Sequence, residues 1–248
     1  MIVDPHHPDT AIARRALPLL DLTDLGDACS DQAIDTLCGK ARASRVAAVC
    51  VWPQHIHRCA ELLAGSPVRI ATVINFPVGG TDIERAVEDT AEALDDGAHE
   101  IDLVMPYRAF LAGDARIAAG MIEAVREIAG RAILKVILES GTMPERGQIT
   151  RASRLAIAAG ADFLKTSTGK SAVSATPEAA EAMLAAIRES GRPVGFKVSG
   201  GLRTVADAGL YLAIADRIMG QGWVEPKTFR IGASSLCDAL TASLGGHA

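Results

Sequence analysis

Two lysines lie inside short apolar segments of the sequence, each just before a polar turn. Lys165 ends the run FLK and is followed by TSTGK, whereas Lys197 lies in GFKV and is followed by SGG. Neighbouring strands lie about 4.8 Å apart, so lysines at matching depth on two such strands bring their amines together. A free lysine has a pKa of about 10.4, and a nearby cation and desolvation both lower that value. The pair therefore predicts an amine that can attack a carbonyl.

The alternative for each lysine is structural. Its side chain then points outward under a helix and reaches solvent, or it pairs with an acid. For one lysine in a strand this alternative is favoured. For two lysines that both precede turns of Gly, Ser and Thr, we favour a function.

An acidic residue accompanies the two lysines. Asp102 lies among aliphatic residues in EIDLV, where a carboxylate can pair with amines, move protons, or do both. Asp21 and Thr23 lie in the segment LDLT, at the end of another apolar run, and extend the same cluster of polar residues. Lys135 lies in a further apolar segment, where the pattern allows an accessory inward position or an outward one.

Three turns that follow apolar segments have the composition of an anion site. Glycine lets backbone N–H groups approach a ligand, and serines that open a helix place that ligand at the helix N-terminus, which favours negative charge. Ordinary turn and cap usage is the alternative. We expect phosphate contacts from Lys170, Gly200, Gly201, Gly232, Ser234 and Ser235, with Thr168 lining the site.

Three other patterns are misleading or less specific. The GKS at 169–171 resembles the end of a P-loop, but Leu164 occupies the position of the required glycine. His55 and His57 are two residues apart at a predicted helix start, where their side chains diverge, and no Cys/His cluster completes a metal site. We therefore expect no metal. Cys50 ends an apolar segment, where it packs or lines the active site.

Strands and helices alternate along the chain. Short β-branched or apolar runs predict strands at residues 17–23, 46–52, 69–75, 100–105, 132–139, 163–166, 194–198 and 229–231. Ala-rich segments predict helices at residues 31–43, 55–64, 81–96, 117–129, 148–159, 177–189, 204–215 and 234–243. No linker divides these units. The pattern therefore favours a single (β/α)8 (TIM) barrel domain that spans residues 1–248, and a doubly wound open sheet is the alternative. In such barrels, functional groups gather at the carboxyl ends of the strands.

Composition limits the partners. A length of 248 residues suits such a barrel, and a formal net charge of -5 argues against binding nucleic acid or an anionic membrane. Five cysteines without a C-x-x-C pair indicate reduced thiols. The first ten residues lack the order of a signal peptide, and no apolar run approaches the roughly 20 residues of a membrane span. We expect a cytoplasmic protein.

Six segments resemble the deoxyribose-phosphate aldolase family of class I aldolases, and the resemblance extends from about residue 17 to residue 244. They are LDLT at 20–23, IATVINFP at 70–77, EIDLVMPYR at 100–108, ADFLKTSTGK at 161–170, GFKVSGG at 195–201 and GASSL at 232–236. The most specific of them is ADFLKTSTGK.

The resemblance assigns roles by position. It implies that Lys165 forms the Schiff base, that Lys197 perturbs its pKa, and that Asp102 serves a proton relay. It also implies that Lys170, Gly200, Gly201, Ser234 and Ser235 hold the substrate phosphate. The chain ends in GGHA, without the C-terminal tyrosine that some members use in protonation. The resemblance therefore names no group that protonates the enamine in this chain.

The implied reaction is reversible cleavage of 2-deoxy-D-ribose 5-phosphate to D-glyceraldehyde 3-phosphate and acetaldehyde, as in deoxyribose phosphate catabolism. It needs no cofactor, and its partners are small phosphorylated sugars and aldehydes. Members are often dimers, so a homodimer is the implied assembly. Two rival classes stay open: another phosphate-sugar barrel aldolase or isomerase, and a non-catalytic phosphate-sugar binding protein.

Overall fold

The predicted strands form a closed parallel barrel in the computed structural model, which describes residues 7–245. Within this range eight strands pair in sequence order, and the last pairs with the first. They are β1 (Leu20–Asp24), β2 (Ala48–Val51), β3 (Arg69–Ile74), β4 (Glu100–Val104), β5 (Ile133–Ile137), β6 (Phe163–Lys165), β7 (Gly195–Ser199) and β8 (Phe229–Ala233). The (β/α)8 barrel is confirmed, and the open sheet is excluded.

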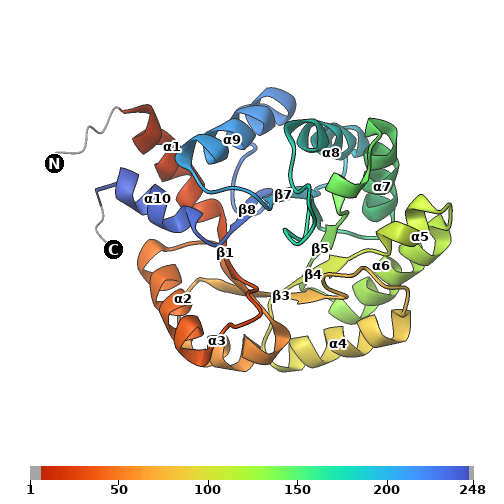
Figure 1. The fold of residues 1–248 in the computed structure, drawn as a ribbon, viewed down its shortest axis with the longest axis horizontal. Coiled ribbons are helices and arrows are strands. Elements are labelled where there is room, and N and C mark those ends of the chain that lie inside the picture. The colour runs from red at the N-terminus through yellow and green to blue at the C-terminus, as the bar shows by residue number, and fades with distance from the viewer. Residues whose placement is uncertain (1–6, 246–248) are drawn as a thin grey trace.

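Helices surround the barrel as an outer ring (Figure 1). The ten α-helices of the described residues are α1 (Pro8–Ala16), α2 (Asp31–Ser44), α3 (Ile56–Leu62), α4 (Ile83–Asp95), α5 (Tyr107–Leu111), α6 (Ala115–Ala129), α7 (Arg146–Ala158), α8 (Pro177–Ser190), α9 (Val205–Met219) and α10 (Leu236–Ser243). Local sequence explains several ends. Thr176 caps α8 by accepting a hydrogen bond from the N–H of Ala179, and Pro177 follows at the first helical position.

The structure differs from the predicted elements at three places. Helices α1 and α5 were not predicted, and the first predicted strand begins with a 3₁₀ turn at Leu17–Leu19. Helix α1 packs against α9 and α10, where Arg15 pairs with Asp216 at 2.9 Å. Helix α1 is only weakly apolar, and its burial depends on elements near the other end of the chain, which begin at Val205 and Leu236.

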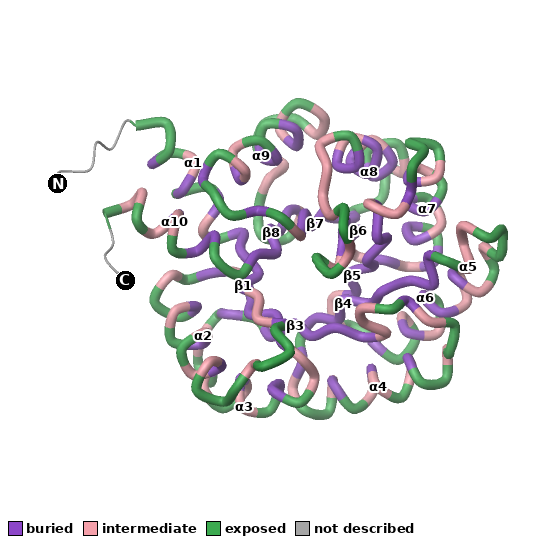
Figure 2. Tube along the Cα trace, in the orientation of Figure 1, coloured by how far each residue is buried: buried purple, intermediate pink, exposed green. Residues whose placement is uncertain are grey.

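Burial follows the two layers of the fold. Nearly all strand residues are buried, while the outer faces of the helices are exposed (Figure 2). Small side chains such as Ala179, Ala180 and Ala186 let α8 approach its neighbours closely. Because helices cover one face of the sheet and side chains fill the barrel interior, the strands are buried on both faces.

None of the helices within residues 7–245 is long and apolar enough to cross a membrane. Both limits of the expected domain, residues 1 and 248, lie outside the described residues. So do the last three residues of the GGHA end.

Candidate active site

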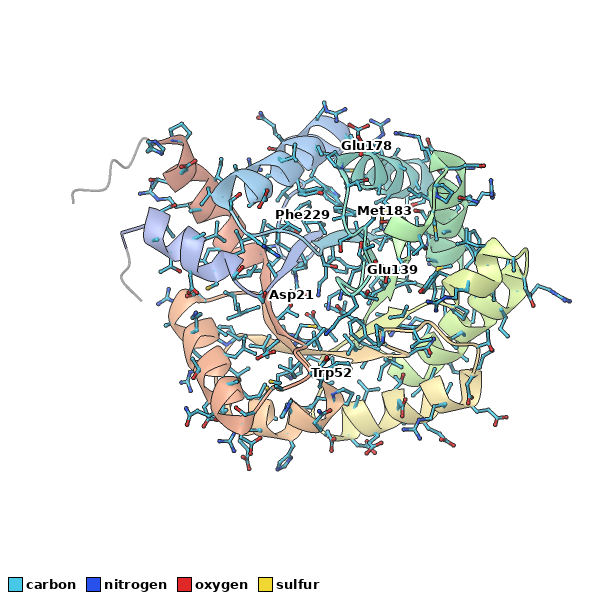
Figure 3. All side chains as sticks on the ribbon, in the orientation of Figure 1. Asp21, Trp52, Glu139, Glu178, Met183 and Phe229 are labelled. Atoms are coloured by element: carbon cyan, nitrogen blue, oxygen red, sulfur yellow. The ribbon has the colours of Figure 1, made fainter. Side chains whose placement is uncertain are left out.

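A layer of charged side chains fills the middle of the barrel, where bulky apolar side chains ordinarily pack. It comprises Asp21 on β1, Glu100 and Asp102 on β4, Lys135 on β5, Lys165 on β6, Lys197 on β7 and Arg230 on β8, all of them buried. Figure 3 labels Asp21 towards the middle of the barrel and Glu178 at its outer rim. Charged groups stay buried in this way only when they are paired and hydrogen-bonded.

Asp102 lies between the two lysines singled out in the sequence. Its Oδ2 atom accepts a hydrogen bond from Nζ of Lys165 and another from Nζ of Lys197, each at 2.7 Å. The two lysines are direct partners in the register of β6 and β7, which confirms their expected equal depth. Lys135 points inward as well, and its Nζ donates to Asp102 Oδ1 at 2.7 Å.

The two central lysines differ in proton affinity. Burial lowers the pKa of Lys165, and although Asp102 opposes this effect, the positive charge of Lys197 helps to keep the pKa below its usual value. Burial lowers the pKa of Lys197 too, but Asp102 and Asp21 outweigh it, and the pKa is raised. Lys197 Nζ lies 2.6 Å from Asp21 Oδ2. Of the two amines, Lys165 is therefore the one that loses its proton more readily.

The pKa values of two carboxyl groups in the layer, Asp102 and Asp21, are lowered. Burial by itself raises the pKa of Asp102, but Lys135, Lys165 and Lys197 together hold it well below its usual range. The pKa of Asp21 is lowered in the same way, because Lys197 and Arg230 outweigh its burial. A carboxylate so stabilised is a weak base on its own but a good bridge between amines.

A cavity of about 420 Å³ lies at the carboxyl ends of the strands, above this layer. Lys165 lines it, and among the described residues it is the only one of the three central lysines that does so. Thr23 and Thr168 also line the cavity. Asp21 and Cys50 do not. Both are fully buried, and Cys50 Sγ lies 4.0 Å from Asp102 Oδ2.

The turns predicted to hold phosphate meet on one side of this cavity. Its lining includes Lys170, Gly200, Gly201, Gly232, Ser234 and Ser235. Gly200 and Gly201 have φ values of 92° and 89°, which glycine adopts without strain. A Cβ at Gly232 would lie 2.9 Å from Lys197 Cε, so this glycine also makes room for the lysine. Ser234 and Ser235 are exposed at the N-terminus of α10.

The sequence analysis missed Glu139, which holds the loop after β6. Its buried carboxylate accepts hydrogen bonds from the N–H and the Oγ1 of Thr168, the latter at 2.6 Å, and from Ser171 Oγ at 3.0 Å. Its φ of 53° is uncommon for a residue with a side chain. Gly141 follows, where a Cβ would lie 1.9 Å from Val173 O. The available signal was an acid at the carboxyl end of the strand predicted at residues 132–139.

Glu100, Arg230 and Arg203 were missed as well. Glu100 lies two residues before Asp102 and therefore on the same face of β4, which the spacing could have shown. Arg203 lines the cavity beside Gly201 and is exposed. No group of three or more His, Cys, Asp or Glu side chains within residues 7–245 is arranged to hold a metal ion.

Fold and site together are those of a (β/α)8 enzyme whose cavity is lined by a lysine of lowered pKa. The family model described as DeoC/LacD family aldolase matches residues 6–239. The chain belongs to this family of aldolases.

Individual relatives agree with the family. The deoxyribose-phosphate aldolase of Agrobacterium fabrum strain C58 is 49% identical over 250 residues, covering 99% of this chain and 96% of the relative. A solved structure of a candidate deoxyribose-phosphate aldolase from Coccidioides immitis is 30% identical with a TM-score of 0.84, covering 94% of this chain and 86% of the other. A deoxyribose phosphate aldolase from Aeropyrum pernix, described as a unique tetramer, shares the fold at 23% identity and a TM-score of 0.76, covering 97% and 94%.

Proposed function

We propose that this aldolase cleaves 2-deoxy-D-ribose 5-phosphate reversibly to D-glyceraldehyde 3-phosphate and acetaldehyde through an iminium at Lys165. The observation that carries the proposal is the shared contact of Lys165 and Lys197 with one oxygen of Asp102, combined with their opposite pKa shifts. A buried site that holds one amine neutral and the next cationic prepares the first as a nucleophile.

The covalent steps begin at Lys165 Nζ. The neutral amine adds to the C1 aldehyde of the open-chain sugar, and loss of water gives an iminium that accepts electrons from the C2–C3 bond. The C3 hydroxyl loses its proton as that bond breaks, which releases D-glyceraldehyde 3-phosphate and leaves an enamine of acetaldehyde on the lysine. Protonation at C2 and hydrolysis release acetaldehyde and restore the amine.

Asp102 serves these steps as a relay. The ammonium groups of Lys135 and Lys197 hold its pKa low, so it is too weak a base to hold the C3 proton by itself. Its Oδ2 contacts both Lys165 and Lys197, and a proton can therefore pass between the two amines and a substrate-bound water without leaving the site.

The phosphate fits the side of the cavity formed by the turns after β6, β7 and β8. Backbone N–H groups at Gly200 and Gly201 and the N-terminus of α10 suit a dianion, since helix N-termini carry partial positive charge. Lys170 contributes a cation, and its Nζ lies 3.3 Å from Asp27 Oδ1.

Trapping of the intermediate tests the proposal. Incubation with acetaldehyde followed by borohydride should inactivate the protein and add one ethyl group, located by peptide mass spectrometry at Lys165. Lys165→Leu should abolish both adduct and turnover. A label on Lys197 would exchange the two roles, and an active enzyme without an adduct would favour an isomerase that uses Asp102 alone.

The expected homodimer and cytoplasmic location stay predictions. The structure of the Aeropyrum pernix protein, which shares the fold, is described as tetrameric. Light scattering of the purified protein distinguishes a dimer of this 25.9 kDa chain from a tetramer. The measurement is made at concentrations above and below about 1 µM, on the order of the dissociation constant below which a dimer counts as stable.

A further inference from the structure

Arg230 on β8 is the register partner of Lys197 and has no part in the mechanism described so far. It is 4% exposed and does not line the cavity. Its Nη1 donates to Asp21 Oδ1 at 2.7 Å and to Glu100 Oε2 at 3.1 Å, while its Nη2 donates to Glu100 Oε1 at 3.0 Å. Its Cζ lies 5.7 Å from the ring centroid of Phe163, so an aromatic face covers the guanidinium from one side.

Two chains of contacts connect Arg230 to Lys165. In the first, Asp21 links Arg230 to Lys197, whose Nζ contacts Asp102. In the second, Glu100 links Arg230 to Lys135 at 2.6 Å, and Lys135 also contacts Asp102. Both chains end at the carboxylate that holds Lys165. A charge at Arg230 is thus felt at Lys165 through buried groups.

The charges of this layer balance only when Lys165 is neutral. A protonated Lys165 would add a fourth positive charge to a layer that holds three carboxylates, and an unbalanced charge in a buried layer is costly. When Lys165 is not counted, the layer holds three carboxylates and three cations. The carboxylates are Asp21, Glu100 and Asp102, and the cations are Lys135, Lys197 and Arg230.

The other titratable groups near the layer do not change this balance. Burial raises the pKa of Cys50, so its thiol is uncharged. His99 Nδ1 accepts a hydrogen bond from the N–H of Ile70, and burial lowers its pKa, so the ring is neutral. Arg69 Nε lies 3.9 Å from Glu100 Oε1, but its side chain is 47% exposed and solvent screens its charge.

We propose that Arg230 is a positioning residue that completes the charge balance of the barrel interior, so that Lys165 gives up its proton at near-neutral pH. The proposal rests on the proposed function of Lys165 as the nucleophile. Arg230 acts through Asp21 and Glu100 and touches no substrate.

The size of the effect follows from the strand spacing. Strand β8 is two strands from β6, a distance of about 10 Å. At an effective dielectric constant of about 20, one charge at that distance shifts the pKa of an amine by roughly one unit. Removing the Arg230 cation should raise the pKa of Lys165, whereas removing the Glu100 anion should lower it.

The test uses four variants of the full chain: Arg230→Lys, Arg230→Met, Glu100→Gln and the Arg230→Met/Glu100→Gln double variant. Each is incubated with acetaldehyde and cyanoborohydride between about pH 5 and pH 10, a range that brackets the lowered pKa of a buried lysine. The rate of ethylation at Lys165 is followed by peptide mass spectrometry. The rising limb of the rate against pH reports the fraction of neutral amine.

Opposite shifts are expected from the two single changes. Arg230→Met should move the rising limb up by about one pH unit and Glu100→Gln should move it down, because they alter the balance in opposite senses. The double variant and Arg230→Lys should stay near the unmodified protein. If Arg230→Met does not fold, Glu100→Gln is compared with the double variant instead. The rising limb, which Glu100→Gln moves down, should move back up in the double variant to that of the unmodified protein.

The proposal is overturned if both single variants move the limb in one direction, or if neither moves it while the unmodified protein is ethylated at Lys165. A purely structural role would lower stability without opposite shifts. Failure of the unmodified protein to form any adduct at Lys165 would instead refute the proposed function, so the two failures are distinguishable.

Discussion

Removal of the Lys197 cation should slow iminium formation at neutral pH without preventing it. The change is Lys197→Met, which keeps an unbranched side chain of similar length and removes the charge. Lys165 Nζ and Lys197 Nζ each lie 2.7 Å from the same oxygen of Asp102, so twice that distance is the upper limit of their separation.

The magnitude follows from this geometry. Two unit charges about 5 Å apart at an effective dielectric constant of about 20 interact by about 3 kcal/mol, which corresponds to roughly two pKa units. Without Lys197, the negative charge of Asp102 also acts more fully on Lys165 and moves its pKa in the same direction. At pH 7 the neutral fraction of Lys165, and with it the rate of trapping, should fall about a hundredfold.

The sign of the pH dependence is specific. Lys165 attacks as the neutral amine, so a raised pKa shifts the rising limb of the trapping rate to higher pH. The variant should therefore gain about tenfold in rate per pH unit and recover much of its activity in alkaline solution. The assay is reductive trapping with acetaldehyde at a series of pH values, with Lys40→Met as the matched control. Lys40 pairs with Asp238 at the surface, and its loss should leave the profile unchanged.

Stability must be measured beside the rate. Breaking a buried ion pair from one side costs about 3–5 kcal/mol, and Lys197→Met leaves Asp21 and Asp102 with fewer partners. Circular dichroism at the assay temperature shows which samples are folded. A folded variant whose trapping rate falls equally at every pH, with no shift of the limb, would refute the assigned role of Lys197.

Three further experiments test the rest of the site. Ser235→Asp should raise KM for 2-deoxyribose 5-phosphate about 30-fold, because a carboxylate and a dianion some 4 Å apart in a hydrated site repel each other by about 2 kcal/mol. Activity with unphosphorylated 2-deoxyribose should fall much less, and equal losses for both sugars in steady-state assays would place the anion elsewhere. Glu139→Ala should cost about 1–3 kcal/mol of unfolding free energy and raise KM for the phosphorylated sugar, because Thr168 loses its acceptors, whereas Glu139→Gln keeps an acceptor and should stay close to the unmodified protein in denaturant titrations. Activity should survive exhaustive treatment with EDTA, since an iminium and not a metal accepts the electrons; a loss that Zn²⁺ restores would contradict the lysine mechanism.

Local sequence determined the succession of strands and helices and the place along the chain of Lys165, the proposed nucleophile. Runs such as FLK and GFKV are apolar and short, and the polar turns after them mark the carboxyl ends of strands. These signals depend only on neighbouring residues, so they can be recognised in the sequence without knowledge of the fold. The depth of Lys165 and Lys197 also followed, because both precede their turns by a similar number of residues.

Only the closed barrel decided which way the buried charges point. Strands of this fold are covered on both faces, so the period of two that separates a solvent face from a core face is lost. The pattern therefore left Lys135 open between inward and outward, and it gave no reason to single out Arg230. In the structure both contact Glu100, at 2.6 Å from Lys135 and 3.0 Å from Arg230.

The pKa values belong to the tertiary structure as well. The sequence shows that Lys165 and Lys197 are of one type and in similar segments, but it does not show which is neutral. That difference arises because Asp21, which is 176 residues before Lys197, pairs with Lys197 and not with Lys165. The sequence placed two lysines at matching depth, and the arrangement of carboxylates from strands β1 and β4 decided which one has the lowered pKa.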